Sequence, residues 1–332
     1  MGSVRFLSIV VPVYCEQEVI NEFYIRLKSV LDQLGASVKY EVIFVNDCSR
    51  DDSIALLKAL NKKDASVKVI SLARNFGHQI AITVGIDYAK GDAVVVMDGD
   101  LQDPPEVIPD MFNKWIEGYK VVYGVRRERR GEGLMKVNVA KMFYRFLNLM
   151  STIKIPTDVG DFRLMDRVVV NTLKTMREEN RYVRGLVAWV GFSQTGVYFD
   201  RDPRYAGKAK YTLSKLTRLA MSGITSFSEK PLYFSSYLGL VVTLLSFAGS
   251  LWIIIGKMMN QALVIQGWTT IMLAIFFFGG VQLFSMGIIG QYIAKIYNEV
   301  KRRPLYVIQE KIGIEEQNLL QDAERLREQG AS

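Results

Sequence analysis

The first hundred residues alternate between short, continuous apolar runs and longer stretches in which apolar residues recur every three or four positions. The runs have the length and β-branched composition of strands that are buried on both faces. They are Leu7–Val13, Tyr40–Val45, Val67–Leu72 and Ala93–Met97. The stretches with helical periodicity are residues 19–34, Ile54–Leu60 and His78–Ala89. This alternation predicts an α/β fold with a mostly parallel, doubly wound sheet.

A different pattern begins at Pro231. No charged residue occurs from there to Gly256, and after Lys257 none occurs until Lys295. Because about 20 apolar residues suffice to cross a bilayer, the pattern predicts two transmembrane helices, at about 234–255 and 270–293. A buried helical hairpin in a soluble core is the alternative, and the length of the uncharged run disfavours it.

Basic residues are distributed unequally around these two segments. Lysines and arginines follow the second segment, whereas the connection between the segments has only Lys257. The positive-inside rule therefore predicts that both termini are cytoplasmic. Two further segments, 134–150 and 211–227, combine basic and apolar residues. Each is expected either to lie in the membrane interface or to pack its apolar face on the soluble domain.

The overall composition narrows the classes of function. The formal net charge is +8, which suits nucleic acid, anionic lipid or phosphorylated small molecules. No nucleic-acid-binding motif is present, and the apolar segments favour lipid. Two cysteines and one histidine support neither a disulfide framework nor a Cys/His metal site, so two reduced thiols are expected. The N-terminus lacks the pattern of a signal peptide.

Polar residues stand where the predicted strands end. Tyr14 and Glu16 follow the first run, Asp47 follows the second, and Asp98 and Asp100 follow the fourth. In such sheets ligands bind beyond the carboxyl ends of the strands, so these side chains should line one crevice. A dinucleotide-dependent oxidoreductase would need a glycine-rich turn after the first strand, and residues 12–16 contain no glycine.

Two of these carboxylates are one residue apart. Asp98 and Asp100, directly after a buried strand, are suited to share a divalent cation with substrate phosphates. The expected ion is Mg²⁺ or Mn²⁺, and a nucleotide-sugar diphosphate would supply the phosphate oxygens. The metal would also neutralise charge on the departing nucleoside diphosphate.

Eight stretches spread along the chain now support a family resemblance. They are SIVVPVYCE (8–16), VNDCSRDDS (45–53), ARNFGHQIA (73–81), MDGDLQDPPE (97–106), GVRRERRGEG (124–133), GDFRLMDR (160–167), YAGKAKY (205–211) and ITSFSEKPL (224–232). Together they resemble the inverting family 2 glycosyltransferases of the GT-A fold. More narrowly, the chain is similar to the polyisoprenyl-phosphate glycosyltransferases, which include dolichol-phosphate mannose synthase and the GtrB-type bactoprenol glucosyltransferases.

The resemblance implies a role for each matching residue. A first group would bind the uridine and ribose: Pro12, Tyr14, Glu16 and Asp47. Asp98 and Asp100 would hold the metal and the donor diphosphate, with Gln102 as a further nucleotide-binding residue. Asp161 would lie by the reacting carbon and the acceptor phosphate. The candidates for binding phosphate groups are Arg126, Arg204, Lys208 and Lys210.

Some positions leave alternatives open. The family usually has Asn where this chain has Cys15, and Asp-Asp-Gly or Asp-Asp-Asn where it has Asn46-Asp47-Cys48. Asn46 lacks a charge but keeps hydrogen-bonding capacity. His78 is expected to be structural. A structural Asp–Arg pair at a turn is the alternative for Asp161, and a solvated basic loop is the alternative for Lys208 and Lys210.

The resemblance also implies an activity and a domain organisation. The expected reaction is transfer of one sugar, glucose from UDP-glucose, to undecaprenyl phosphate, with inversion, at the cytoplasmic face of the inner (plasma) membrane. Other donors (aminoarabinose, mannose, a hexosamine) and a non-catalytic membrane scaffold are the alternatives. Processive polysaccharide synthesis is disfavoured, because no Q-x-x-R-W motif is present. The expected partners are a nucleotide sugar, polyisoprenyl phosphate, membrane lipids and a second copy of the chain in a homo-oligomer, but no nucleic acid.

The expected segments follow from these assignments. They are a cytoplasmic GT-A catalytic domain at 1–210, a juxtamembrane amphipathic helix at 211–232, two transmembrane helices at 233–294, and a charged cytoplasmic tail at 295–332. Within the tail, the charged stretch 310–327 is expected to form a surface helix or an oligomer contact.

Overall fold

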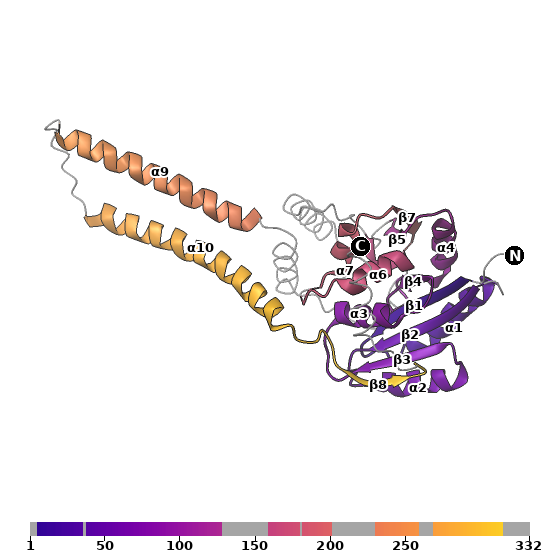
Figure 1. Cartoon of the computed structure of the whole chain (residues 1–332). Coiled ribbons are helices and arrows are strands. Elements are labelled where there is room, and N and C mark those ends of the chain that lie inside the picture. Colours follow the sequence, from indigo (N-terminus) through magenta and orange to yellow (C-terminus); the bar gives the residue numbers. More distant parts are fainter. Residues whose placement is uncertain are drawn as a thin grey trace. The chain divides into compact units, whose positions relative to one another are not determined.

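The computed structural model describes six stretches of the chain, which are residues 5–35, 38–127, 159–179, 181–200, 230–258 and 268–314. These residues fall into two compact units. The first is an α/β domain that contains the described residues up to 200 together with 304–314, and the second contains two long helices (Figure 1).

The α/β domain is built on one eight-stranded sheet in the order β7-β5-β6-β4-β1-β2-β3-β8. The strands are β1 (Arg5–Val13), β2 (Val38–Asn46), β3 (Val67–Leu72), β4 (Ala93–Val96), β5 (Val121–Arg126), β6 (Val159–Asp166), β7 (Gln194–Phe199) and β8 (Ile308–Ile312). The four strands predicted from apolar runs form the parallel centre, β4-β1-β2-β3, while β6 and β8 are antiparallel to their neighbours β4 and β3. The predicted doubly wound, mostly parallel sheet is therefore confirmed.

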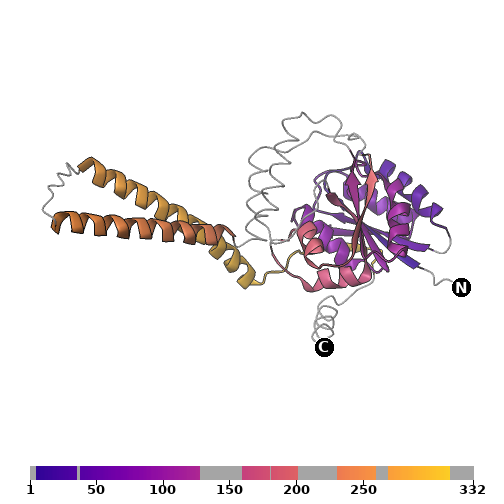
Figure 2. The same ribbon diagram turned by 90° about the horizontal axis from the view of Figure 1, so that it is seen from above.

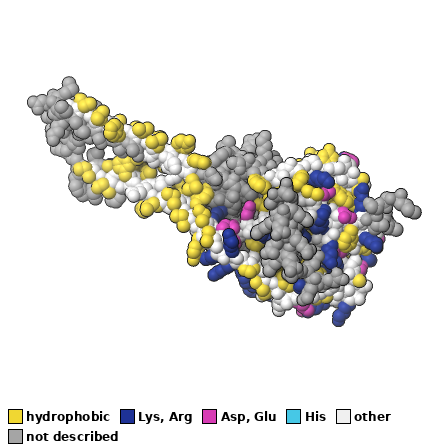
Figure 3. Space-filling model, viewed as in Figure 1, with side chains coloured by type: hydrophobic (Ala, Val, Ile, Leu, Met, Phe, Trp, Pro, Cys, Tyr) yellow, Lys and Arg dark blue, Asp and Glu magenta, His cyan; other side chains and the backbone are white. Residues whose placement is uncertain are grey.

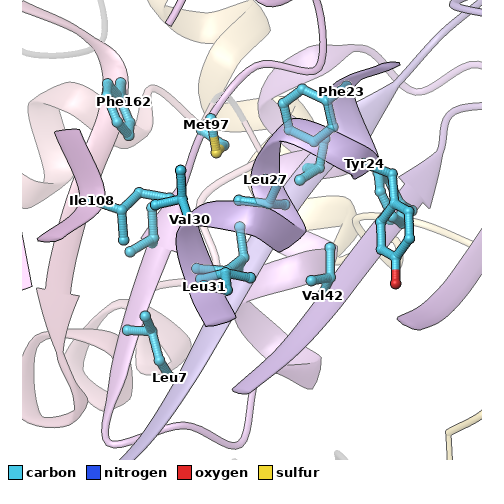
Figure 4. Close-up of a cluster of buried hydrophobic side chains, with 14 of the residues drawn as sticks. Leu7, Phe23, Tyr24, Leu27, Val30, Leu31, Val42, Met97, Ile108 and Phe162 are labelled. Carbon is cyan, nitrogen blue, oxygen red and sulfur yellow. The ribbon is translucent and has the colours of Figure 1, made fainter. Parts of the chain in front are cut away.

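Helices cover both faces of this sheet (Figure 2). They are α1 (Ile20–Gln33), α2 (Ser53–Lys63), α3 (His78–Tyr88), the 3-10 helix η1 (Pro105–Val107), α4 (Ile108–Ile116), α6 (Arg167–Thr175) and α7 (Val183–Trp189). The main core lies under α1, whose Phe23, Leu27 and Leu31 pack against Leu7 and Val42 of the sheet (Figure 4). All five side chains are buried, which is why helical periodicity and continuous apolar runs alternate along the sequence.

On the opposite face, α3 approaches β1 very closely. A Cβ atom added to Gly85 would lie 2.1 Å from Cγ1 of Val10. This close packing fixes the position of α3, and the first residue of α3 is His78.

The second unit consists of α9 (Lys230–Met258) and α10 (Trp268–Lys301), which run antiparallel to each other (Figures 1 and 2). Both are long and apolar enough to cross a membrane, and they contain the two predicted segments. Only 6% of the apolar window in α9 and none of that in α10 is buried. Hydrophobic side chains are exposed along both helices (Figure 3). This exposure is unlike that of a core helix in a soluble protein and agrees with membrane association.

The chain after α10 differs from the predicted tail. Residues 308–312, which include the start of the stretch expected to form a surface helix, make β8 and pair antiparallel with β3, for example Val69 with Ile312. The physical reason is that β3 would otherwise be an open edge, which an extended segment can satisfy with main-chain hydrogen bonds. The predicted amphipathic segments at 134–150 and 211–227, and the tail beyond residue 314, lie outside the described residues.

Candidate active site

The predicted site residues converge at one edge of the sheet. Pro12 lies near the end of β1, and Tyr14, Asp47, Asp98 and Asp100 follow β1, β2 and β4. Because these strands are parallel, their carboxyl ends meet at the same edge. Glu16 is half-buried in the turn before α1, and its amide donates to Oγ of Ser53 over 3.1 Å.

Asp161 reaches the same edge because β6 runs the other way. In the antiparallel pair of β4 and β6, Val96 lies opposite Arg163. Asp98 follows Val96 by two residues and Asp161 precedes Arg163 by two, so both carboxylates lie just beyond the last pair of this ladder. Asp161 is buried, with 4% of its surface exposed, whereas Asp98 is half-buried. The sheet register thus places the donor-side and acceptor-side carboxylates of the predicted site next to each other.

His78 lies between these two carboxylates. Its Nε2 atom is 3.3 Å from Oδ2 of Asp161 and 3.4 Å from Oδ1 of Asp98. Burial alone would lower the pKa of His78, but the hydrogen bond to Asp161 and the charges of both aspartates raise this pKa to about 9. The imidazole is therefore a cation at neutral pH. Sequence reasoning gave this residue a structural role, and the structure brings it into the site.

Arg184, at the start of α7, holds Asp161 most tightly. Its Nε atom donates to Oδ1 over 2.7 Å and its Nη2 atom donates to Oδ2 over 2.8 Å. Burial alone would raise the pKa of Asp161, but the charge and hydrogen bonds of Arg184 hold this pKa well below its usual range. Asp161 is therefore an ionised carboxylate whose two oxygens already accept hydrogen bonds, which suits orientation and charge stabilisation more than proton abstraction.

The sequence also allowed a structural Asp–Arg pair within residues 160–163. Asp161 does pair with an arginine, but its partner is Arg184. The nearby Arg163 instead donates from Nη2 to the carbonyl oxygen of Gly160 over 2.8 Å. Arg184 is 23 residues from Asp161 along the chain. No local motif in the sequence signals such a pairing, because it depends on how α7 packs beside β6.

Asp47 links the predicted nucleotide end of the crevice to α3. Its two carboxylate oxygens accept hydrogen bonds from the amides of Phe76 (2.7 Å) and Gly77 (2.9 Å). Burial raises the pKa of Asp47, although these hydrogen bonds oppose the shift. Gly77 has a φ of +95°, a conformation that favours glycine, and it sets the start of α3 immediately before His78. Asp47 therefore positions the two residues that directly precede the bridging histidine at the start of α3.

The environment of Asp98 fits a divalent cation. Within the described part of the chain, its Oδ1 atom is inaccessible to solvent and accepts no hydrogen bond. Burial raises the pKa of Asp98, as does the proximity of Asp161 and Asp100, although His78 opposes the shift. Among the described residues, the nearest cation to this oxygen is the imidazole of His78 at 3.4 Å, which donates no hydrogen bond to it, and a divalent cation would stabilise such a buried anionic oxygen further.

Residues 98–102 offer few side chains that could coordinate a metal ion. Asp100 accepts a hydrogen bond from the amide of Gln102 at Oδ1, over 3.1 Å, and Gln102 is buried beside it. The described residues contain no group of three or more His, Cys, Asp or Glu side chains that could hold a metal without substrate. This donor set fits Mg²⁺ or Mn²⁺, which often bind through one or two carboxylates plus substrate phosphates.

Of the four predicted phosphate-binding residues, the structure places one. Nη2 of Arg126 is 3.7 Å from Oδ1 of Asp103, which is buried. The same nitrogen lies against Gly160, where an added Cβ would come within 2.8 Å of it. Arg126 is thus at the end of β5, beside the residue that precedes Asp161. The other three, Arg204, Lys208 and Lys210, lie outside the described residues.

Comparisons with known proteins agree with this geometry. The model of the family described as "Glycosyl transferase family 2" matches residues 8–174. "Uncharacterized glycosyltransferase YkcC" of Bacillus subtilis is 50% identical over 315 residues, which cover 95% of this chain and 97% of that protein. The "SfII prophage-derived bactoprenol glucosyl transferase" of Shigella flexneri is 42% identical, over 91% of this chain and 97% of that protein. The "Prophage bactoprenol glucosyl transferase homolog" of Escherichia coli is 40% identical, over 91% and 98%.

Proposed function

The chain belongs to glycosyltransferase family 2, and from this membership we propose that it transfers one glucose from UDP-glucose to undecaprenyl phosphate. Relatives named as bactoprenol glucosyl transferases cover nine tenths of the chain at about 40% identity, which supports glucose and a polyprenyl phosphate carrier. The structural observation that carries the proposal is the approach of Asp98 and Asp161 to one histidine at the carboxyl edge of the sheet.

The donor would lie across the ends of β1, β2 and β4. Pro12, Tyr14, Glu16 and Asp47 would line the uridine subsite, and Tyr14 offers a ring that is 42% exposed. Asp98 and Asp100 would hold Mg²⁺ or Mn²⁺, with Gln102 beside them. When bound, the metal would neutralise charge on the departing diphosphate.

The acceptor would meet the site at Asp161. The second pKa of a phosphate monoester is near 6, so the acceptor is largely dianionic at neutral pH and needs little help from a base. Asp161 is ionised and held by Arg184 and His78. Its role would be to orient these two cations toward the acceptor phosphate and to stabilise charge at the anomeric carbon. A single displacement by the phosphate oxygen, with UDP leaving from the opposite face, inverts that carbon.

The location of the reaction follows from the acceptor. The polyprenyl chain stays in the bilayer, so its phosphate must be bound at the membrane surface. We assign α9 and α10 to the membrane and both termini to the cytoplasm, because basic residues follow α10. Basic residues at this surface would gain about 1 kcal/mol each from anionic lipid. The proposal includes a homo-oligomer and the segment boundaries predicted above, except that residues 308–312 of the tail belong to the α/β domain as β8.

The test is transfer of label into lipid. Purified protein in nanodiscs is incubated with undecaprenyl phosphate, Mg²⁺ or Mn²⁺, and a panel of radiolabelled nucleotide sugars. We expect metal-dependent transfer from UDP-glucose that is abolished in Asp98→Ala. The matched control is Asp110→Ala, which removes an exposed carboxylate on α4 and should leave transfer unchanged.

The outcomes separate the competing functions. Transfer from a different donor would keep the enzyme class but replace glucose. Transfer that survives chelation by EDTA would contradict the metal-dependent part of the proposal. Absence of transfer from every donor, together with absence of UDP binding, would support a non-catalytic scaffold.

A further inference from the structure

Gln79, the second residue of α3, makes two side-chain hydrogen bonds to residues that are far from it in the sequence. Its Oε1 atom accepts from the amide of Val183 over 2.9 Å. Its Nε2 atom donates to Oδ2 of Asp161 over 3.3 Å. These contacts fix the orientation of the side-chain amide, since only its oxygen can accept from a backbone N–H. One side chain therefore joins three elements, α3, α7 and β6.

The first of these bonds holds the start of the helix that carries Arg184. Val183 is the first residue of α7, and the amides in the first turn of a helix have no partner within that helix. Tyr182, which precedes it, makes no side-chain capping hydrogen bond. Gln79 thus supplies an acceptor to one of these amides from another helix. Because Arg184 directly follows Val183, the bond fixes the backbone from which the guanidinium reaches Asp161.

The second bond reaches the carboxylate that Arg184 holds. Oδ2 of Asp161 accepts from Nη2 of Arg184 over 2.8 Å as well as from Nε2 of Gln79. Asp161 is buried and Gln79 is half-buried. Hydrogen bonds to a carboxylate are stronger than those between neutral groups. Gln79 therefore contacts one partner of the Asp161–Arg184 pair directly and is linked to the other through the backbone of Val183.

The packing of α3 gives this link a firm base. The helix lies so close to β1 that a Cβ atom on Gly85 would come within 2.1 Å of Cγ1 of Val10. The buried Thr83 donates from Oγ1 to the carbonyl of Gln79 over 2.8 Å. A misplacement of about 1 Å in an active site can cost about 100-fold in turnover. A rigid connection between α3 and the Asp161–Arg184 pair is therefore expected to affect turnover.

We propose that Gln79 is a positioning residue, whose one side-chain amide holds Asp161 and Arg184 in a fixed geometry toward the acceptor phosphate. It acts through these two residues, and its role rests on the proposed function, which places both of them on the acceptor side of the site. A role limited to capping α7 is the structural alternative. The two differ in which of the two hydrogen bonds matters for turnover.

Two variants of similar size separate the two hydrogen bonds. Gln79→Met removes both. Gln79→Glu keeps an oxygen that accepts from Val183, but at pH 8, well above the ordinary glutamate pKa of about 4.3, it places a second carboxylate against Asp161. The matched control is Gln194→Met, because Gln194 of β7 also holds α7, with its Nε2 donating to the carbonyl of Val187 over 3.1 Å.

The experiment uses full-length protein in nanodiscs at pH 8, with undecaprenyl phosphate and radiolabelled UDP-glucose. For each variant we measure turnover per folded molecule, KM for undecaprenyl phosphate, UDP affinity and unfolding temperature. Gln79→Glu is also combined with Asp161→Asn. If Gln79 acts through the Asp161 carboxylate, the effects of these two substitutions on turnover are not additive.

We expect turnover to fall about tenfold in Gln79→Met and at least about thirtyfold in Gln79→Glu, because a like charge displaces Asp161 more than a missing hydrogen bond does. UDP affinity should stay within about twofold of wild type in both variants, since the proposed uridine subsite follows β1 and β2. In the Asp161→Asn background, Gln79→Glu should lower turnover further by less than about twofold. Gln194→Met should lower the unfolding temperature and keep turnover within about twofold of wild type.

Other results would overturn the proposal in distinguishable ways. Slower turnover in Gln79→Met than in Gln79→Glu would show that Gln79 only caps α7. Turnover of Gln79→Glu within about twofold of wild type, or full additivity with Asp161→Asn, would refute the link to the Asp161 carboxylate. An active wild type with unaffected Gln79 variants refutes the positioning role alone. If wild type transfers no glucose, the proposed function fails and the positioning role fails with it.

Discussion

Asp161 is the residue on which the proposed mechanism depends most. Arg184, His78 and Gln79 all contact its carboxylate, and Arg184 does so with two nitrogens. Asp161→Asn would leave a neutral amide against this positive charge and would remove the carboxylate from the proposed reacting centre. We expect turnover to fall about 100-fold or more, with UDP affinity within about threefold of wild type. Lipid-transfer kinetics and calorimetric UDP titration measure the two quantities.

A second aspartate on the same strand is the matched control. Asp166 is also buried, but at the opposite end of β6, where it accepts hydrogen bonds from Trp115 and Lys120. Asp166→Asn should lower the thermal stability of the domain while leaving turnover per folded molecule unchanged. Turnover of Asp161→Asn within about threefold of wild type would show that the role assigned to Asp161 is wrong.

At the scale of elements, Asp64 joins α1 to the end of α2. Its carboxylate accepts hydrogen bonds from Tyr24 and Lys28 of α1 and from the amide of Ser66. Burial alone would raise the pKa of Asp64, but these contacts hold it far below its usual range. We expect Asp64→Asn to lower the free energy of unfolding by about 2 kcal/mol at pH 7.

The pH dependence of this difference has a definite sign. Because the pKa of Asp64 is lower in the folded than in the unfolded state, its contribution is complete above about pH 4, the unfolded value, and is lost as pH falls toward the folded value. Urea denaturation of wild type and Asp64→Asn at intervals from pH 7 to pH 3 should therefore show that their free energies of unfolding converge below pH 4.

The control Asp32→Asn removes a carboxylate that is 56% exposed and should lower the free energy of unfolding by less than about 0.5 kcal/mol. A difference that stays constant to pH 3 would contradict the role of the Asp64 charge.

The elements also show what the sequence could and could not predict. The central strands and α1, α2 and α3 were predictable because continuous apolar runs and helical periodicity are local signals. β6 was not predicted, since it carries Asp161 and Arg163 in buried positions and therefore breaks the apolar pattern. The placement of Asp98 and Asp100 at the carboxyl edge was predictable from their position after a buried strand. The contacts of His78 and Arg184 with Asp161 were not, because they join elements far apart in the sequence.

At the scale of the whole molecule, the apolar helices interrupt the α/β domain in the sequence. Within the described residues, the chain forms β1 to β7, continues through α9 and α10, and then returns to add β8 beside β3. The returning segment also contributes Tyr306, whose hydroxyl donates to the buried Asp87 over 2.9 Å, while Nη1 of Arg177 donates to the same oxygen over 2.6 Å. The α/β domain is therefore incomplete without residues that follow the second helix.

This arrangement predicts that the thermal stability of the α/β domain depends on how the apolar helices are removed. A chain that ends at residue 229 lacks β8 and Tyr306, so the edge of β3 is open and Asp87 loses the hydrogen bond from Tyr306. A chain in which a flexible linker of about 20 glycine and serine residues replaces 230–303 retains both.

We expect the truncated chain to unfold at a temperature about 5–10 °C lower than the linked chain, since losing a paired edge strand and one buried hydrogen bond should cost about 2–3 kcal/mol. Differential scanning fluorimetry measures this difference, and Tyr306→Phe in the linked chain, with a loss of about 1 kcal/mol, separates the hydrogen bond from the strand. Equal unfolding temperatures for the truncated and linked chains would mean that β8 adds nothing to the stability of the sheet, and the α/β domain would then be complete without the residues that follow the apolar helices.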